Sequence, residues 1–263
     1  MGTKERTPAI LVFGGLDPTA GAGILMDSRA ACAAGAHACA IASCLAIQTT
    51  KTFLRFSPIS REALDDSLAC AGRSFRLGAV KVGMVGTRAA AEAIFSFVCA
   101  NPKIPVIVDP VLRSSSGFLL LAKSALPAYR KLIQAASVLT PNLMEAEKLL
   151  DRKISSFSEA IDAAATLSEA ASAAVVLKGG HFPWKGRTGI DIVASDKTIT
   201  LVPPAKARRG DPHGTGCALA AAIAARIAAG DAIVPAVTAA KSVLAKLVEG
   251  SFPSAEGRPT LFP

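Results

Sequence analysis

The sequence predicts an α/β fold in which a mainly parallel central sheet is covered by helices on both faces. The first observation is size, because 263 residues suit one large α/β domain. The second is a series of short, continuously apolar runs, each of which stops at a polar or glycine-rich turn. The third is that helical patterns separate these runs, which is the order expected of parallel strands buried on both faces.

The predicted elements follow one another along the whole chain. The apolar runs that predict strands are Ala9–Phe13, Cys39–Ile47, Ala79–Val82, Pro105–Val108, Ser137–Leu139 and Ala174–Leu177. The helical patterns are Gly21–Ala34, Arg88–Ala100, Lys123–Ala135, Met144–Leu150, Ser158–Ala170, Gly214–Ala229 and Ala232–Val248. Asp191–Val193 and Thr198–Leu201 predict an antiparallel hairpin at the edge of the sheet.

The chain is expected to form a single domain over residues 1–263. No internal repeat, low-complexity linker or domain boundary interrupts the pattern. The core is expected to span about residues 9–250. The segment 251–263 is rich in Pro, Ser and Gly and is expected to be a loose tail.

The net charge of +9 does not predict a nucleic-acid partner. Lys and Arg are scattered, and the densest set, Lys206, Arg208 and Arg209, is short and has no aromatic side chains between its members. A positive field suits instead a protein that attracts phosphorylated ligands.

The six cysteines and the apolar segments indicate a cytoplasmic protein. No cysteine pair has CxxC spacing, and no Cys/His spacing predicts a zinc site. Free thiols among small apolar residues fit a reducing compartment. The N-terminal apolar run is too short for a secretory segment, and the Ala-rich stretch 30–50 contains polar residues, so no membrane span is predicted.

The segment His213-Gly214-Thr215-Gly216-Cys217 directly precedes a strong helical pattern. Glycine lets backbone approach a ligand closely, and a helix start presents free amide groups to an anion. That device suits the charge on a transferring phosphoryl group; a glycine turn that binds no ligand is the competing interpretation. The position of Cys217 at the helix start predicts a lowered thiol pKa and a role as a base; a small pocket-lining residue is the competing interpretation.

Other candidate residues fall where predicted strands end, which is where ligands bind in parallel sheets. A second glycine cluster runs from Gly14 to Gly23 and lacks both the dinucleotide and the Walker A spacing. Asp109 and Glu145 offer the few carboxylates that Mg²⁺ prefers, although Glu145 is equally suited to the first turn of a helix. Lys178, followed by two glycines, suits a nucleotide phosphate.

Taken together and in order, seven segments resemble the hydroxymethylpyrimidine/phosphomethylpyrimidine kinases of the ribokinase-like superfamily. They are GGLDPTAGAGILMD, LAIQTT, VKVGMVG, VDPVLRSSSG, LTPNLMEAE, LKGGH and HGTGC, and they extend from about Ile10 to Gly230. The resemblance implies a three-layer αβα fold and ATP-dependent phosphorylation of 4-amino-5-hydroxymethyl-2-methylpyrimidine, and then of its monophosphate, in thiamine biosynthesis. It also implies ATP and Mg²⁺ as cofactors and a homodimer.

The resemblance also implies roles for individual residues. The pyrimidine pocket would be formed by Ala22, Gln48, Met84, Val111 and Cys217, with Asp27 holding its polar network. Asn142, Lys178 and Thr215 would face ATP, and Asp109 and Glu145 would govern Mg²⁺. The anion hole would be made by Gly214, Gly216 and Cys217.

Some positions depart from the family pattern, and two other functions compete. Leu25 and Met26 replace the usual Gln-Ala pair, and Ala20 replaces a frequent glycine. A pyridoxal kinase of the same superfamily is the nearest alternative, although Gln48 can both donate to and accept from a pyrimidine edge. The other alternative is a module that binds the pyrimidine without turning it over, which the set of Asp109, Glu145 and Lys178 argues against.

Overall fold

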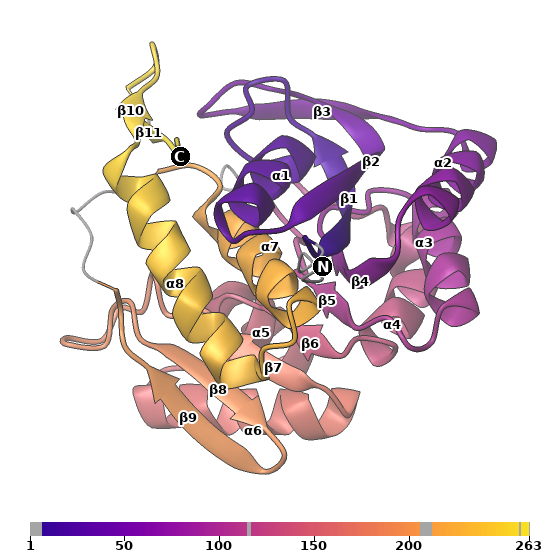
Figure 1. Cartoon of the computed structure of the whole chain (residues 1–263). Helices are drawn as coiled ribbons and strands as arrows, with labels where there is room; N and C mark the ends of the chain where they lie inside the picture. The colour runs from indigo at the N-terminus through magenta and orange to yellow at the C-terminus, as the bar shows by residue number, and fades with distance from the viewer. Residues whose placement is uncertain (1–6, 115–116, 206–211, 258, 263) are drawn as a thin grey trace, which may run out of the picture.

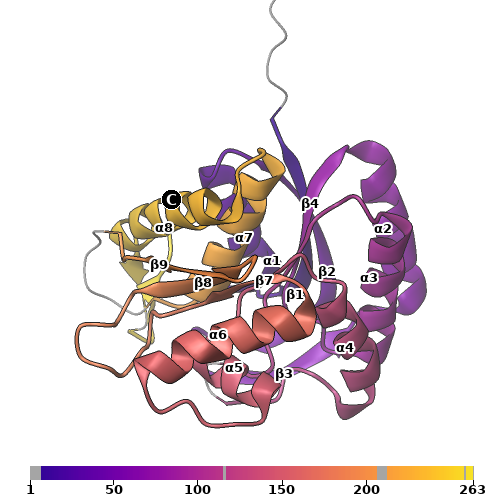
Figure 2. The same cartoon turned by 90° about the horizontal axis from the view of Figure 1, so that it is seen from below.

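The computed structural model describes residues 7–114, 117–205, 212–257 and 259–262. The basic set Lys206, Arg208 and Arg209 lies outside these residues. Nine strands form one twisted sheet, and helices cover both of its faces (Figures 1 and 2). The predicted α/β architecture with a mainly parallel sheet is therefore confirmed.

Six strands of the sheet are parallel, and three strands at its edges are antiparallel to their neighbours. In spatial order the strands are β3 (Phe53–Pro58), β2 (His37–Gln48), β1 (Ala9–Leu16), β4 (Leu77–Val82), β5 (Val106–Val108), β6 (Val138–Leu139), β7 (Ala174–Leu177), β8 (Asp191–Ser195) and β9 (Thr198–Val202). The predicted hairpin is β8–β9, and its turn places Asp196 and Lys197 at φ of 49° and 61°. Two residues with positive φ match the twist of a two-residue hairpin.

Two helical layers bury the apolar side chains of the strands. One layer consists of α1 (Gly23–Ala33), α7 (Thr215–Ala228) and α8 (Ile233–Glu249). The other consists of α2 (Arg61–Ser74), α3 (Arg88–Ala100), a 3₁₀ turn (Lys123–Ala125) that leads into α4 (Leu126–Gln134), α5 (Leu143–Leu150) and α6 (Phe157–Ala171).

Alternate residues of β1 show why both faces must be covered. Leu11 and Phe13 pack into the core under α2–α6, whereas Ile10 and Val12 pack into the core under α1, α7 and α8. All four are fully buried. Side chains of a strand point alternately to its two faces, so a continuous apolar run is what two covering layers require.

β3 and α2 are two elements that the sequence pattern does not predict. β3 lies at the edge of the sheet, and Leu54 is 57% exposed there. α2 buries only Leu64 and Leu68, so it lacks a wide apolar stripe. Ser60 caps α2 by accepting a hydrogen bond from the backbone N–H of Ala63, which is a recognisable helix-start signal.

The tail after α8 packs against the body, which corrects the expectation of a loose tail. β10 (Phe252–Pro253) pairs with β11 (Pro259–Thr260), and Leu261 is fully buried. Thr260 forms a parallel bridge with His213. These contacts use backbone groups and one leucine, so they leave no periodic signal in the sequence.

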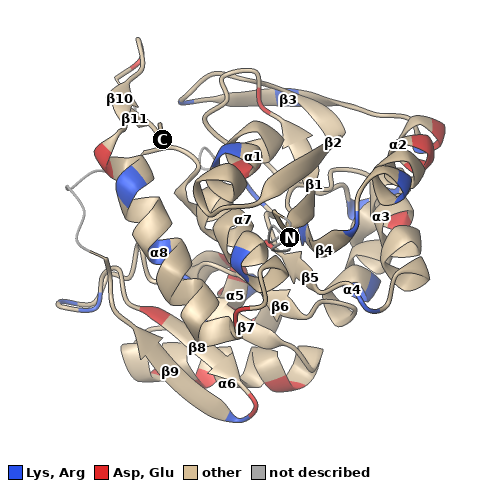
Figure 3. Cartoon of the chain, in the orientation of Figure 1, with Lys and Arg blue, Asp and Glu red and all other residues tan. Residues whose placement is uncertain are grey.

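Among the described residues, the charged side chains form no basic stripe and the cysteines form no disulfide. Figure 3 shows Lys and Arg spread over both helical layers of the described chain. All six cysteines are free thiols, but Cys32, Cys70 and Cys99 are exposed instead of buried among apolar neighbours. Among the described residues, no helix has the length and apolarity needed to cross a membrane.

Candidate active site

Lys178 and two carboxylates meet beyond the carboxyl ends of the central strands. The Nζ atom of Lys178, directly after β7, lies 2.6 Å from Oδ1 of Asp109, directly after β5. It also lies 3.9 Å from Oε2 of Glu145. The hydroxyl of Thr140 donates to Asp109 Oδ1 at 3.2 Å. The structure thus brings together three of the predicted residues and adds Thr140.

Asn142 and Glu145 form the start of α5 through a capping box. Asn142 Oδ1 accepts a hydrogen bond from the Glu145 N–H at 2.9 Å, and Glu145 Oε2 accepts one from the Asn142 N–H at 2.8 Å. Asn142 also pairs with Lys178 in a parallel bridge. Glu145 is therefore both a helix-start acid and a neighbour of Lys178, so the two interpretations of this residue are compatible.

Burial and the neighbouring charges shift the protonation of this cluster. Burial raises the pKa of Glu145 to about 7, with Asp109 adding to the rise and Lys178 opposing it. Burial tends to lower the pKa of Lys178, but Asp109 and Glu145 outweigh it, so that pKa is raised. Lys178 is therefore charged at neutral pH, and the Glu145 carboxyl loses its proton close to neutral pH.

The donor set suits Mg²⁺ better than a metal that needs a closed protein cage. Among the described residues, no three His, Cys, Asp or Glu side chains form a metal cluster. Asp109 and Glu145 supply hard oxygen donors next to a lysine. Mg²⁺ binds through one or two carboxylates together with waters and substrate phosphates, so these two residues fit it.

The glycine turn at the start of α7 lies against the same cluster. Gly214 is the N-cap of α7 with φ of 88°, a conformation that favours glycine. A Cβ atom on Gly214 would overlap the carbonyl oxygen of Gly21, and one on Gly216 would lie 3.3 Å from Lys178 Nζ. Thr215 is the first residue of the helix. The amides of a 14-residue helix therefore begin beside the lysine.

Cys217 lies in this helix start, but its thiol is not activated. Burial raises the pKa of Cys217 to about 11, although Lys81 and a backbone hydrogen bond from Gly23 oppose the rise. The expectation that the helix start lowers this pKa is wrong, because loss of hydration outweighs the charge of Lys81 and the hydrogen bond from Gly23. The structure favours the pocket-lining interpretation of Cys217.

A fully buried ion pair lies next to Cys217. Asp27 of α1 and Lys81 of β4 are 0% and 1% exposed, and Lys81 Nζ lies 2.8 Å from Asp27 Oδ2. Burial raises the pKa of Asp27 to about 6, against the attraction of Lys81. Burial tends to lower the pKa of Lys81, but Asp27 and Cys217 outweigh it, so that pKa is raised. Asp27 is therefore held by a lysine, and its role in the polar network of the pyrimidine pocket stays a prediction.

The predicted pyrimidine-binding residues come from several elements: Gln48 ends β2, Met84 and Val111 follow β4 and β5, and Ala22 is the N-cap of α1. Met84 packs with Val111, Cys44 and other apolar residues in one small cluster. A Cβ atom on Gly15 would lie 3.1 Å from Met84 Sδ, so a side chain there would crowd Met84. A flat ring can pack on such a surface.

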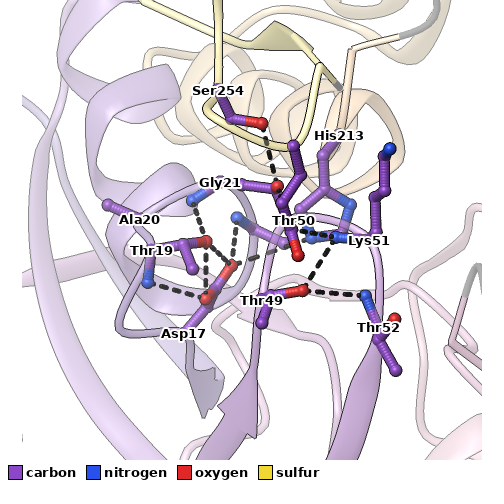
Figure 4. A network of polar contacts seen from close by, with 12 residues as sticks. Asp17, Thr19, Ala20, Gly21, Thr49, Thr50, Lys51, Thr52, His213 and Ser254 are labelled. Carbon is purple, nitrogen blue, oxygen red and sulfur yellow. Dashed lines mark hydrogen bonds and ion pairs between the residues drawn. The ribbon is translucent and has the colours of Figure 1, made fainter.

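Asp17 is the polar centre of the neighbouring glycine turn. Its Oδ2 accepts a hydrogen bond from the N–H of Ala22, the N-cap of α1, at 2.9 Å. The Thr19 hydroxyl donates to Asp17 Oδ1 at 2.8 Å (Figure 4). Burial would raise the pKa of Asp17, but the neighbouring His213 and hydrogen bonds from Gln48 and Thr19 lower it. An ionised Asp17 thereby links Gln48 and Ala22, two residues predicted for the pyrimidine pocket.

His213 faces this carboxylate from the opposite end of the chain. Its Nε2 lies 3.7 Å from Asp17 Oδ2, and within the described part of the chain neither ring nitrogen has a hydrogen-bond partner. A Cβ atom on Gly21 would lie 2.9 Å from His213 Cδ2. Ala20, where the family pattern often has glycine, adopts φ of 55°.

The sequence pattern did not single out Asp17, Lys81, Thr140 or His213 for a role. Lys81 carried a usable signal, because a charge inside a buried strand needs a partner or a function. Asp17 and His213 lie within two glycine clusters that were recognised, but their mutual contact joins segments far apart in the sequence.

Comparisons with known proteins agree with this geometry. The sequence model of the phosphomethylpyrimidine kinase family matches residues 17–260. A hydroxymethylpyrimidine/phosphomethylpyrimidine kinase of Rhizobium meliloti is 32% identical over 90% of this chain and 89% of its own. A thiamine biosynthesis multifunctional protein of Corynebacterium efficiens is 30% identical over 95% of this chain, which spans 34% of that relative.

Solved structures show the same ribokinase-like fold. A phosphomethylpyrimidine kinase of Clostridium difficile superposes with a TM-score of 0.78 at 25% identity, covering 90% of this chain and 97% of its own. A pyridoxal kinase of Bacillus subtilis, solved as an ADP complex, superposes with a TM-score of 0.84 at 24% identity, covering 97% of both chains. The second likeness concerns the fold alone.

Proposed function

The chain belongs to the phosphomethylpyrimidine kinase family, and from that premise we propose that it transfers the γ-phosphoryl group of ATP to the hydroxymethyl group of 4-amino-5-hydroxymethyl-2-methylpyrimidine, and then to the monophosphate formed, in thiamine biosynthesis. The observation that carries this proposal is the convergence of Lys178, Asp109 and the glycine turn of α7 at one edge of the sheet.

On this proposal, the start of α7 and Lys178 stabilise the transferring phosphoryl group. The amides of Gly214 and Gly216 form the anion hole, and Lys178, Asn142 and Thr215 hold the nucleotide. Phosphoryl transfer through a loose transition state depends mainly on positioning and on charge stabilisation. A buried lysine beside the first turn of a helix supplies both.

Asp109 and Glu145 would hold Mg²⁺ at this edge of the sheet. When bound, the ion would neutralise charge on the phosphate oxygens. Lys178, which pairs with Asp109, would add a positive charge beside these phosphates.

The acceptor binds with its ring against Met84 and Val111 and its polar edge toward Gln48. The Gln48 amide can donate to a ring nitrogen and accept from the neighbouring amino group. Its own hydrogen bond to Asp17 fixes its orientation. Cys217 and Ala22 line the pocket, and the buried pair of Asp27 and Lys81 lies next to Cys217 and supports it.

Pyridoxal phosphorylation is the second candidate function, because the chain shares its fold with a pyridoxal kinase over 97% of both chains. The test is product analysis with ATP and, in parallel, the hydroxymethyl pyrimidine, its monophosphate and pyridoxal. The proposal expects mono- and diphosphate products from the pyrimidines and slower turnover of pyridoxal. If only pyridoxal is phosphorylated, pyridoxal replaces the pyrimidine as the substrate. If none of the three compounds causes ATP consumption, the chain is a module that binds the pyrimidine without turning it over.

We also propose that residues 1–263 act as one kinase domain, in the cytoplasm and as a homodimer. The β2–β3 ribbon supports a self-association surface, because Leu45 and Leu54 are 40% and 57% exposed on it. Light scattering on the purified protein gives the mass. A monomer at micromolar concentration would contradict the dimer.

A further inference from the structure

The C-terminal tail contacts both loops that border the proposed acceptor pocket. Residues 252–257 reach the loop that follows β2, and residues 259–262 run beside His213, which precedes the glycine turn of α7 (Figures 1 and 4). These two loops come from opposite ends of the sequence. The tail is therefore an element that both of them touch.

The first contact is a chain of hydrogen bonds to the turn Thr49–Thr52. The hydroxyls of Ser254 and Thr50 lie 2.9 Å apart, and Thr50 donates to Glu256 Oε2 at 2.7 Å. The N–H of Lys51 donates to the same oxygen at 3.2 Å. The hydrogen bonds from Thr50 and from the Lys51 N–H lower the pKa of Glu256, so its carboxyl is an anion at neutral pH.

The turn that Glu256 holds is closed by its own bonds. Thr49 donates its N–H to the carbonyl of Thr52 at 2.9 Å. The Thr49 hydroxyl accepts the N–H groups of Lys51 and Thr52, each at 3.2 Å. Gln48 directly precedes this turn, so a change in the turn is transmitted to the residue that would bind the pyrimidine edge.

The second contact anchors the tail beside the anion hole. The N–H of His213 donates to the carbonyl of Pro259 at 3.0 Å. Leu261 is fully buried and packs with Met26 and Leu247. Gly214, the N-cap of α7, directly follows His213. Asp17 connects the two contacts, because it interacts with both Gln48 and His213.

From these contacts we infer that the tail is a positioning element of the acceptor pocket, and that Glu256 is its positioning residue. The inference rests on the proposed function for the identity of the acceptor. Glu256 fixes the turn after Gln48, while Pro259 and Thr260 fix the backbone before Gly214. The tail thus sets the spacing between the residue that would read the ring and the amides that would receive the phosphoryl group.

The test compares Glu256→Ala with Glu256→Gln, which keeps an acceptor oxygen, and with Glu249→Ala, which removes an exposed acid at the end of α8. Loss of a charge-assisted acceptor should raise KM for the pyrimidine about three- to tenfold. KM for ATP and kcat should change less than about twofold, because the nucleotide side is untouched. Glu256→Gln should recover most of the affinity, and Glu249→Ala should match the wild type.

Equal changes in both KM values, or a lowered Tm with unchanged KM, would reduce the tail to a structural support and overturn the inference. Amide hydrogen exchange gives a readout that does not need turnover. Faster exchange at residues 49–52 in Glu256→Ala, with exchange in α6 unchanged, supports the positioning role of Glu256. Unchanged exchange at 49–52 refutes it. If the wild type phosphorylates neither pyrimidine, the proposed function fails, while amide exchange still tests whether Glu256 holds the turn at residues 49–52.

Discussion

Replacing Cys217 tests whether the reaction needs a protein base. With a pKa of about 11, about one thiol in a thousand is ionised at pH 8. A mechanism that required the thiolate would therefore show a kcat that rises about tenfold per pH unit through the neutral range. If Cys217 only lines the pocket, kcat should not show this rise. Cys217→Ala should then lower kcat less than about fivefold, because the backbone amides of the turn remain.

The assay is the pH dependence of kcat and of kcat/KM for the wild type, Cys217→Ala and the control Cys99→Ala, which removes an exposed thiol. Loss of a general base typically costs about 10²–10⁴ in rate, so the two outcomes are well separated. A wild-type slope of one that disappears in Cys217→Ala would refute the reasoning, and Cys217 would then be the base.

Three further predictions concern the acceptor, the metal and the buried pair. Gln48→Leu should raise KM for the pyrimidine by the equivalent of about 1–3 kcal/mol and leave KM for ATP unchanged; equal KM values in mutant and wild type would remove Gln48 from the pocket. Because the pKa of Glu145 is raised to about 7, a proton competes with Mg²⁺ below that pH. The Mg²⁺ requirement should therefore rise as the pH falls through about 7, and Glu145→Gln should need more Mg²⁺ at all pH values without this dependence; a Mg²⁺ titration that does not distinguish the two proteins would leave Glu145 only its helix-capping role. Lys81→Met should lower the free energy of unfolding by about 3–5 kcal/mol, and adding Asp27→Leu should restore much of it, as measured by denaturant unfolding; a double mutant less stable than Lys81→Met would contradict an uncompensated Asp27 charge as the cause.

Much of the fold could be predicted because its strands are buried on both faces. Continuous apolar runs such as Ala174–Leu177 leave few alternatives, and that strand has the predicted bounds. Edge elements gave weaker signals. β3 is half solvated, and α2 presents two buried leucines on a polar helix. Such elements form because of what they pack against, which a local pattern does not contain.

The candidate site was predictable where motifs follow strand ends and unpredictable where distant segments meet. Asp109, Glu145 and Lys178 are predictable because they stand at the ends of predicted strands, and the structure brings them into contact. The raised pKa of Cys217 could not be foreseen, because the helix start was visible in the sequence while its burial was not. The contact of Glu256 with Thr50 joins residues 206 positions apart, and no periodicity records it.

The contact between Gly214 and the Gly21 carbonyl has a consequence for how the protein becomes active during refolding. Helices and neighbouring strands of such a chain form from local contacts, whereas this glycine contact closes a loop that contains most of the sequence. We therefore expect the glycine turn at the start of α7 to assemble late, after most of the secondary structure is present. In a refolding experiment, the far-ultraviolet circular dichroism signal should recover before activity, and simultaneous recovery of the two would contradict this order of events.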